Sequence, residues 1–114
     1  MLRGRTKRRS QLSLRASIFA ALGAETRLAL VEKLCAGPPQ SISQLAKGSA
    51  LTRQAITKHL RVLETAGVVH SVRVGRESRF EFKLEPLREV QSYLERVSAQ
   101  WDDVLGRLKA FVER

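Results

Sequence analysis

The chain has 114 residues, about the length of one domain. It carries 21 lysine and arginine residues against 11 aspartate and glutamate residues, a formal net charge of +10, which favours an anionic partner. A single cysteine, Cys35, excludes an intramolecular disulfide, and no apolar run approaches the roughly 18 residues of a membrane span. We therefore expect a cytoplasmic protein without a membrane partner.

The positive charge lies in the first two thirds of the chain. Residues 1–9 contain five basic and no acidic residues, residues 50–79 contain six basic and two acidic residues, and residues 85–114 have a net charge of −1. The basic residues fall on a tail, a helix start and a hairpin, whereas a membrane-surface protein places its basic residues along one helix, opposite exposed aromatic residues. This distribution favours contact with a phosphate backbone.

Residues 1–11 are polar and basic, and we expect a disordered basic arm, either a solvated tail or an extra phosphate-binding arm. Residues 12–114 then form one domain. Its first helix, at about 12–22, has Leu14, Ile18 and Leu22 at helical spacing and ends at Gly23.

The second helix is predicted from apolar residues at helical spacing and ends near residue 36, because the Gly-Pro-Pro segment at 37–39 cannot continue it. Its apolar residues are Leu28, Val31, Leu34 and Cys35. A short third helix follows, with Ser41 and Gln44 at the spacing of a capping box and a break at Gly48.

The fourth helix is predicted from Arg53 to about Ala66, with Thr52 as N-cap and Gly67 at its end. At roughly 100° per residue, one arc of this helix is apolar apart from His59. The opposite arc is wholly polar and consists of Arg53, Gln54, Thr57, Lys58, Arg61 and Glu64.

After Gly67 the apolar period changes from helical to alternating, which predicts two strands. Apolar residues alternate with polar ones over 68–74, the segment 75–77 turns the chain, and Phe80, Phe82 and Leu84 alternate with charged residues on the way back. This pattern predicts a β-hairpin with a basic tip that contains Arg73, Arg76 and Arg79.

The last helix is predicted from Leu87 to Glu113, with Pro86 as its first residue, and is about 40 Å long. Its apolar residues recur every seven positions along a stripe longer than so small a domain can cover, so we expect a homodimer. The predicted interface comprises Leu14, Ile18, Leu94, Val97, Trp101, Val104 and Leu108.

These elements predict a mainly α fold with a small β-hairpin, a winged helix-turn-helix with a long C-terminal dimerisation helix. The fourth helix suits the major groove of double-stranded DNA, because Gln, Arg and Lys reach base edges and a helix N-terminus favours phosphate. The expected DNA-binding residues are Thr52, Arg53, Gln54, Thr57, Lys58, Arg61, Arg73, Arg76 and Arg79.

Three segments resemble the ArsR-type transcriptional regulators: Leu22–Leu28 with its L-x-x-x-T-R pattern, Leu51–Val69 as recognition helix, and Gly75–Phe80 as wing. The resemblance implies a homodimer that represses transcription by occupying a promoter and is usually released by a signal. If protein concentration alone controls binding, we expect an autorepressor. Residues 93–96 and 101–108 resemble the subgroup without metal sites. Metal-sensing members carry a Cys-x-Cys pair that residues 43–47 lack, so we expect no metal, no cofactor and an effector that the sequence does not identify.

Individual residues admit other roles. For Cys35 we favour core packing over a redox switch or a metal ligand. His59 and His70 are expected to be partly buried structural histidines, and Trp101 is expected to serve the dimer or the core rather than a ligand platform.

Two alternative functions are a coiled-coil interaction subunit and a thiol- or metal-responsive repressor. An enzyme is not expected, because no catalytic triad, glycine-rich phosphate loop or carboxylate pair is evident. RNA binding is disfavoured because only Phe80 and Phe82 could stack on bases, and both fit the inner face of a strand.

Overall fold

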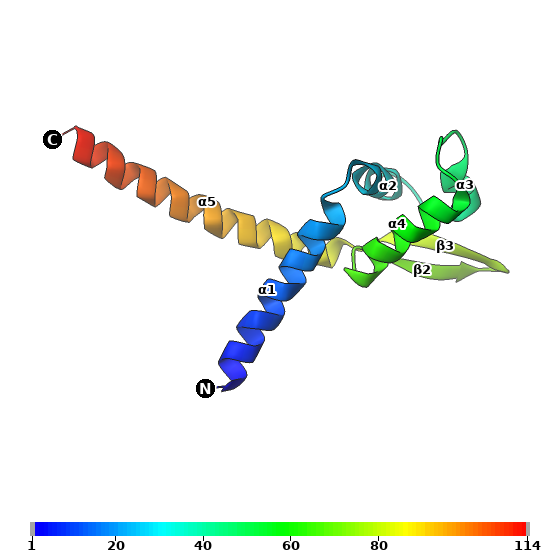
Figure 1. The fold of residues 1–114 in the computed structure, drawn as a ribbon, viewed down its shortest axis with the longest axis horizontal. Helices are drawn as coiled ribbons and strands as arrows, with labels where there is room; N and C mark the ends of the chain where they lie inside the picture. The colour runs from blue at the N-terminus through cyan, green and yellow to red at the C-terminus, as the bar shows by residue number, and fades with distance from the viewer. Residues whose placement is uncertain (1, 114) are drawn as a thin grey trace.

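A computed structural model describes the backbone of residues 2–113 and the side chains of residues 11–113. It is mainly helical with a small antiparallel sheet, which confirms the predicted fold class (Figure 1). The elements are α1 (Leu2–Leu22), α2 (Glu25–Cys35), β1 (Gln40–Ser41), α3 (Ile42–Ala46), α4 (Arg53–Thr65), β2 (Val69–Val74), β3 (Glu77–Phe82) and α5 (Leu84–Val112).

Helix α1 begins earlier than expected. A disordered arm was predicted over residues 1–11, but the backbone from Leu2 onward continues the helix, and Met1 lies outside the described residues. Leucine, arginine, lysine and glutamine are good helix formers, so a segment without an apolar pattern can extend a helix already nucleated by tertiary packing. The helix ends at Leu22, before Gly23, as predicted.

The buried face of α2 differs from the predicted one. Leu30, Val31 and Leu34 lie in the core, whereas Leu28 is 47% exposed and Cys35 is also exposed. Leu28 and Cys35 lie roughly 100° from the centre of the buried face, and Cys35 is the last residue of the helix. The prediction that Cys35 packs in the core is therefore wrong.

Helix α4 supplies the centre of the core. Ile56, Leu60 and Leu63 are fully buried, whereas Val62, predicted on the apolar arc, is 43% exposed. The helix ends in a Schellman motif, in which the N–H of Gly67 donates to Glu64 O at 2.9 Å and the next N–H donates to Leu63 O at 2.9 Å. Gly67 adopts a φ of +80°, which turns the chain into the sheet.

The sheet has the order β1-β3-β2, and both pairs are antiparallel. The hairpin turn consists of Gly75 and Arg76. Gly75 has a φ of +64° and Arg76 has a negative φ, which is the pattern of a type II′ turn. Strand β1 was not predicted, because a strand of two residues is too short to carry an alternating pattern. It pairs Ser41 with Arg79 and thereby brings the start of α3 to the hairpin.

Helix α5 begins at Leu84, so Pro86 is its third residue and not its first. Proline is tolerated there because the first N–H groups of a helix have no intrahelical partner. Helix α1 crosses the first part of α5, where the Arg15 guanidinium lies 3.4 Å from Glu89 Oε1 and 4.9 Å from the Tyr93 ring centroid.

Beyond this crossing α5 extends away from the rest of the domain (Figure 1). The protomer, α5 included, measures 66 × 38 × 21 Å. Val90 is the buried residue of this 29-residue helix. On α1, Ile18 is fully buried within the protomer, so its predicted place in the dimer interface is wrong. Within the described residues, no helix is long and apolar enough to cross a membrane.

Candidate nucleic-acid interface

Helices α3 and α4 and the turn between them form a helix-turn-helix. The predicted capping box at the start of α3 is present, since Ser41 Oγ accepts the N–H of Gln44 at 3.1 Å and Gln44 Oε1 accepts the N–H of Ser41 at 2.8 Å. At the start of α4, Thr52 Oγ1 accepts the N–H of Ala55 at 3.1 Å, as expected for an N-cap. Both helix starts are therefore fixed by their own side chains.

The outward face of α4 brings five predicted residues together. Arg53, Gln54, Thr57, Lys58 and Arg61 line one shallow hollow of about 330 Å³, which we call the reading face. The Thr57 hydroxyl donates to Arg53 O at 2.8 Å, so its proton is already used within the helix. The long side chains of Arg53, Gln54 and Lys58 are exposed.

The charges on the reading face are not neutralised locally. The first turn of α4 has no acidic residue, so the positive end of the helix dipole is open to an anion. Among the side chains that the structure describes, the ion pairs involve none of Arg53, Lys58 and Arg61. This combination favours phosphate and the acceptor groups of base edges.

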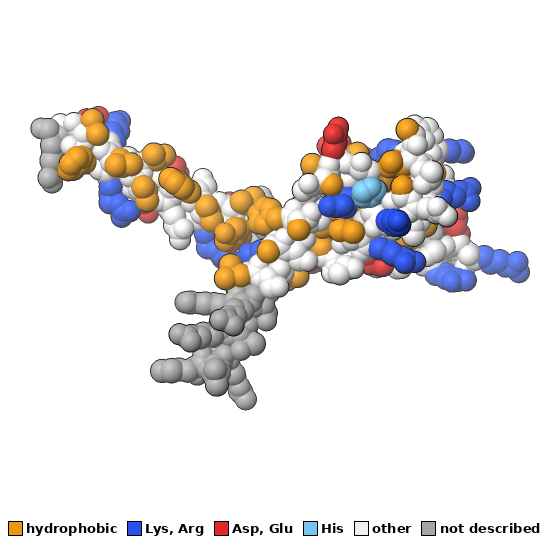
Figure 2. Space-filling model, in the orientation of Figure 1, with side chains coloured by type: hydrophobic (Ala, Val, Ile, Leu, Met, Phe, Trp, Pro, Cys, Tyr) orange, Lys and Arg blue, Asp and Glu red, His pale blue; other side chains and the backbone are white. Residues whose placement is uncertain are grey.

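The hairpin formed by β2 and β3 carries the predicted wing residues, but they are not equivalent. Arg73 lies near the end of β2 and Arg76 in the turn, and both are exposed. Arg79 is half-buried, and its Nε donates to Glu77 Oε2 at 3.0 Å. Basic side chains gather around this hairpin and α4 in Figure 2.

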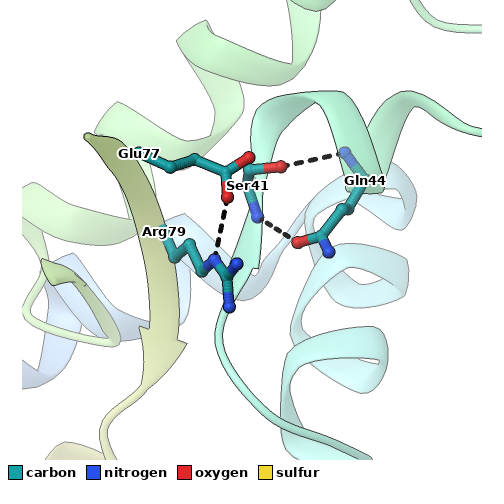
Figure 3. A network of polar contacts seen from close by, with 4 residues as sticks. All are labelled: Ser41, Gln44, Glu77 and Arg79. Carbon is teal, nitrogen blue, oxygen red and sulfur yellow. Dashed lines mark hydrogen bonds and ion pairs between the residues drawn. The ribbon is translucent and has the colours of Figure 1, made fainter. Parts of the chain in front are cut away.

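A polar network joins the wing to the helix-turn-helix (Figure 3). Glu77 accepts a hydrogen bond from Arg79 and lies beside the Ser41 side chain. Arg79 first and the Ser41 hydroxyl second hold the pKa of Glu77 below the ordinary value of 4.5. Ser41 also forms the capping box with Gln44. The approach of Ser41 to Glu77 and Arg79 could not be predicted from the sequence, because it depends on the pairing of the short strand β1 with β3.

Arg27, which the sequence indicates only as part of the L-x-x-x-T-R pattern, forms a second set of contacts that was not predicted. Its Nε donates to Ala21 O, its Nη2 donates to Ala20 O at 3.2 Å, and its Nη1 lies 3.4 Å from His59 Nδ1. Arg27 therefore caps the end of α1 and joins it to α4. The other histidine, His70, pairs with Glu81 Oε1 at 2.8 Å, and both histidines are partly buried, as predicted.

The residues predicted for the dimer interface, other than Ile18, are exposed or partly exposed. Trp101 is 61% exposed, and Leu94, Leu108 and, on α1, Leu14 are each about half exposed. Figure 2 shows hydrophobic side chains in a stripe along α5. This stripe continues through Val97 and Val104, which are partly buried.

Comparison with known proteins agrees with this geometry. A family model described as a helix-turn-helix domain matches residues 13–72. The uncharacterized HTH-type transcriptional regulator YuzN of Bacillus subtilis is 38% identical over 80 residues, which cover 65% of this chain and 87% of YuzN. The solved ArsR-like transcriptional regulator from Rhodococcus sp. RHA1 is 41% identical with a TM-score of 0.80, and the match covers 90% of this chain and 95% of that one.

This chain belongs to the ArsR-like helix-turn-helix transcriptional regulators. The HTH-type transcriptional regulator Rv2034 of Mycobacterium tuberculosis is also similar, 37% identical over 68 residues that cover 60% of this chain and 61% of Rv2034. The chain is thus a DNA-binding transcriptional regulator, and the predicted family and general function are confirmed.

Proposed function

We propose that this ArsR-like regulator is a cytoplasmic homodimeric repressor that recognises a specific double-stranded operator. The observation that carries the proposal is the reading face, where five polar side chains lie along one side of α4 and the capped start of the helix has no neutralising acid. A surface with this composition fits the major groove of B-DNA. By occupying a promoter, such a protein represses transcription, including that of its own gene in an autorepressor.

Within the reading face we assign different roles to different side chains. Arg53 and Gln54 lie in the first turn of α4 and are assigned to base edges, because their planar groups form paired hydrogen bonds with guanine and adenine. Lys58 and Arg61 lie further along the helix and are assigned to phosphates.

The wing residues Arg73 and Arg76 are assigned to the DNA backbone beside the groove, because both are exposed and neither forms an ion pair within the described side chains. Arg79 was expected to bind DNA as well. Since Glu77 already holds its guanidinium, we propose that Arg79 orients the wing and does not contribute a full charge to DNA.

The homodimer is supported by the exposed apolar stripe of α5. Single apolar residues scattered over a surface are normal on a monomer, but a contiguous stripe of them marks an interaction site. Two copies joined through α5 and α1 would present two reading faces, and a two-fold operator has the matching symmetry.

We also propose that repression is relieved without a metal bound to this chain. Cys35 lies at the exposed end of α2, His59 faces Arg27, and His70 pairs with Glu81. These three side chains lie on separate elements, whereas zinc requires three or four converging ligands. Stoichiometric zinc retained after dialysis, with operator affinity changed about tenfold, would favour the metal-responsive alternative.

Selection of binding sites from random duplexes tests the proposed function. We expect enrichment of one two-fold symmetric sequence, with tighter binding than to a scrambled duplex of the same composition. Recovery of no consensus, or binding that is equal for all duplexes, would contradict sequence-specific recognition. A complete lack of duplex binding would favour the alternative of a coiled-coil interaction subunit.

A further inference from the structure

A second hollow, which we call the α1–α4 hollow, lies between α1, the start of α2 and the C-terminal half of α4. Its volume is about 420 Å³, and its walls include Ala20, Ala21, Arg27, Arg61, Val62 and Thr65. Known small-molecule sites have volumes of about 300–1,000 Å³ and are mainly apolar with a few fixed polar groups. The α1–α4 hollow has this character, because alanine and valine side chains lie beside two guanidinium groups.

Arg27 is a preorganised cation in this hollow. A guanidinium has five N–H donors, and Arg27 directs three of them at Ala21 O, Ala20 O and His59 Nδ1. The other two N–H donors have no partner among the described side chains and backbone. Because the side chain is already held in place, a ligand that binds it does not have to order it.

The second cation, Arg61, forms no ion pair among the described side chains. No acidic residue lines the hollow, so its charge selects an anion. Arginine binds carboxylates through paired hydrogen bonds. The apolar surfaces of Ala20 and Val62 would stay in contact with water around a bare inorganic anion, but they would pack against an aliphatic or aromatic group.

We propose that the α1–α4 hollow binds a small organic carboxylate with an apolar body, and that this ligand weakens operator binding. Arg61 provides the coupling, because it lines both the α1–α4 hollow and the reading face. A carboxylate held by Arg61 competes with a DNA phosphate for the same guanidinium. This regulatory step rests on the proposed role of α4 in DNA binding, whereas the ligand site does not.

Ligand binding is tested without DNA by NMR titration of the ¹⁵N-labelled full chain. The probes are sodium hexanoate and sodium benzoate, with hexanamide and benzamide as neutral controls and inorganic phosphate as an anion without an apolar body. We expect saturable shifts of amide signals in residues 17–27 and 61–65 with the two carboxylates, and much weaker effects with the controls. Equal binding of amides or phosphate, shifts confined to α5, or no response to either carboxylate would overturn the proposal.

Substitutions locate the site. Arg61→Gln should weaken carboxylate binding about tenfold, the effect of one charge-assisted hydrogen bond. Ala20→Leu should also weaken it by filling the hollow from an exposed helix position, where leucine is a good helix former. Lys33→Gln removes the same charge from an exposed residue of α2 outside the hollow and should leave binding unchanged. Unchanged binding in both Arg61→Gln and Ala20→Leu would place the ligand elsewhere.

The regulatory step is tested by fluorescence anisotropy with the selected duplex. At a saturating concentration of hexanoate or benzoate, the Kd of the wild-type protein for DNA should rise about fivefold or more, and that of Ala20→Leu should not change. Ligand binding without a change in Kd would refute the coupling. A protein that binds the carboxylates but no duplex would refute the proposed function and the coupling while supporting the ligand site.

Discussion

Arginines that look alike in the sequence have different surroundings in the structure. Arg27 caps α1, and Arg79 is held by Glu77, whereas Arg53 and Arg76 are exposed and form no ion pair within the described side chains. Counting charges along the sequence located the basic surface but could not separate these two kinds of arginine. The Arg27 contacts depend on tertiary packing, which brings the end of α1 and His59 of α4 to its guanidinium. The Arg79 contact is local, because Glu77 lies two residues away on the same strand, but charge counting does not show that the two side chains meet.

The Glu77 carboxyl offers a test of the wing network. Its pKa is lowered first by the hydrogen bond from Arg79 and then by the neighbouring Ser41 hydroxyl. The network is therefore intact above the ordinary value of 4.5 and is lost as the pH falls through the lower, folded-state value. NMR titration of the side-chain carboxyls should show Glu77 titrating below 4.5.

Arg79→Gln should raise the pKa of Glu77 toward its ordinary value, because the largest cause of the shift is removed. Arg73→Gln removes the same charge from the neighbouring strand without breaking a contact to Glu77, and should have little effect. If Glu77 titrates at or above 4.5 in the wild-type protein, the network does not exist in solution.

The N-cap of α4 is a further test at the residue scale. Thr52→Ala removes the acceptor for the Ala55 N–H and should lower the free energy of unfolding by about 1 kcal/mol, measured by urea denaturation. Thr57→Ala on the same helix is the matched control, because its hydroxyl only donates to a carbonyl within the helix. Equal losses for the two variants would argue against a specific capping role.

At the scale of elements, the sequence predicted those with a strong period or a clear end signal. Gly67 ended α4, Gly75 turned the hairpin, and the seven-residue repeat identified α5. The missed features have physical causes: β1 is too short for a pattern, and the start of α1 carries helix formers without an apolar face. Periodicity also cannot tell whether an apolar helix face packs within its own chain, as Ile18 does, or against another chain.

Helix α5 carries the proposed dimer contact, and Trp101 lies in its exposed stripe. Trp101→Glu places a charge where a partner would pack, so we expect light scattering to detect monomers at concentrations where the wild-type protein is dimeric. Ala99→Glu adds the same charge at a position about 200° around the helix and should leave the dimer intact. A monomeric wild-type protein at high micromolar concentration would contradict the proposed homodimer.

At the scale of the whole molecule, the net charge of +10 predicts binding that weakens as salt rises. Each lost phosphate contact reduces the slope of log K against log salt concentration by about 0.9. Arg76→Ala should therefore weaken binding to the operator and to the scrambled duplex alike. It should also lower the magnitude of the slope by about 0.9, the value for one phosphate contact. An unchanged slope would mean that the tip of the wing does not touch DNA.

Much of the proposed interface was visible in the sequence, because a polar arc at the start of a helix follows from spacing alone. The hollow shared by Arg53, Gln54, Thr57, Lys58 and Arg61 agrees with that arc. The α1–α4 hollow was not predicted, since its walls come from α1, α2 and α4 and require tertiary packing. The role of Cys35 was misjudged for the same reason.

The central claim is that the first turn of α4 reads bases, and the most direct test is the Kd of Arg53→Ala and Gln54→Ala for the selected operator and a scrambled duplex. We predict a loss of about 1–3 kcal/mol on the operator for each variant, with a much smaller loss on the scrambled duplex, because a base contact is sequence-specific. Lys58→Ala, assigned to phosphate, should weaken binding to both duplexes equally. If both first-turn variants bind the operator within about twofold of the wild-type affinity, a change well below 1 kcal/mol, α4 is not the element that reads the sequence.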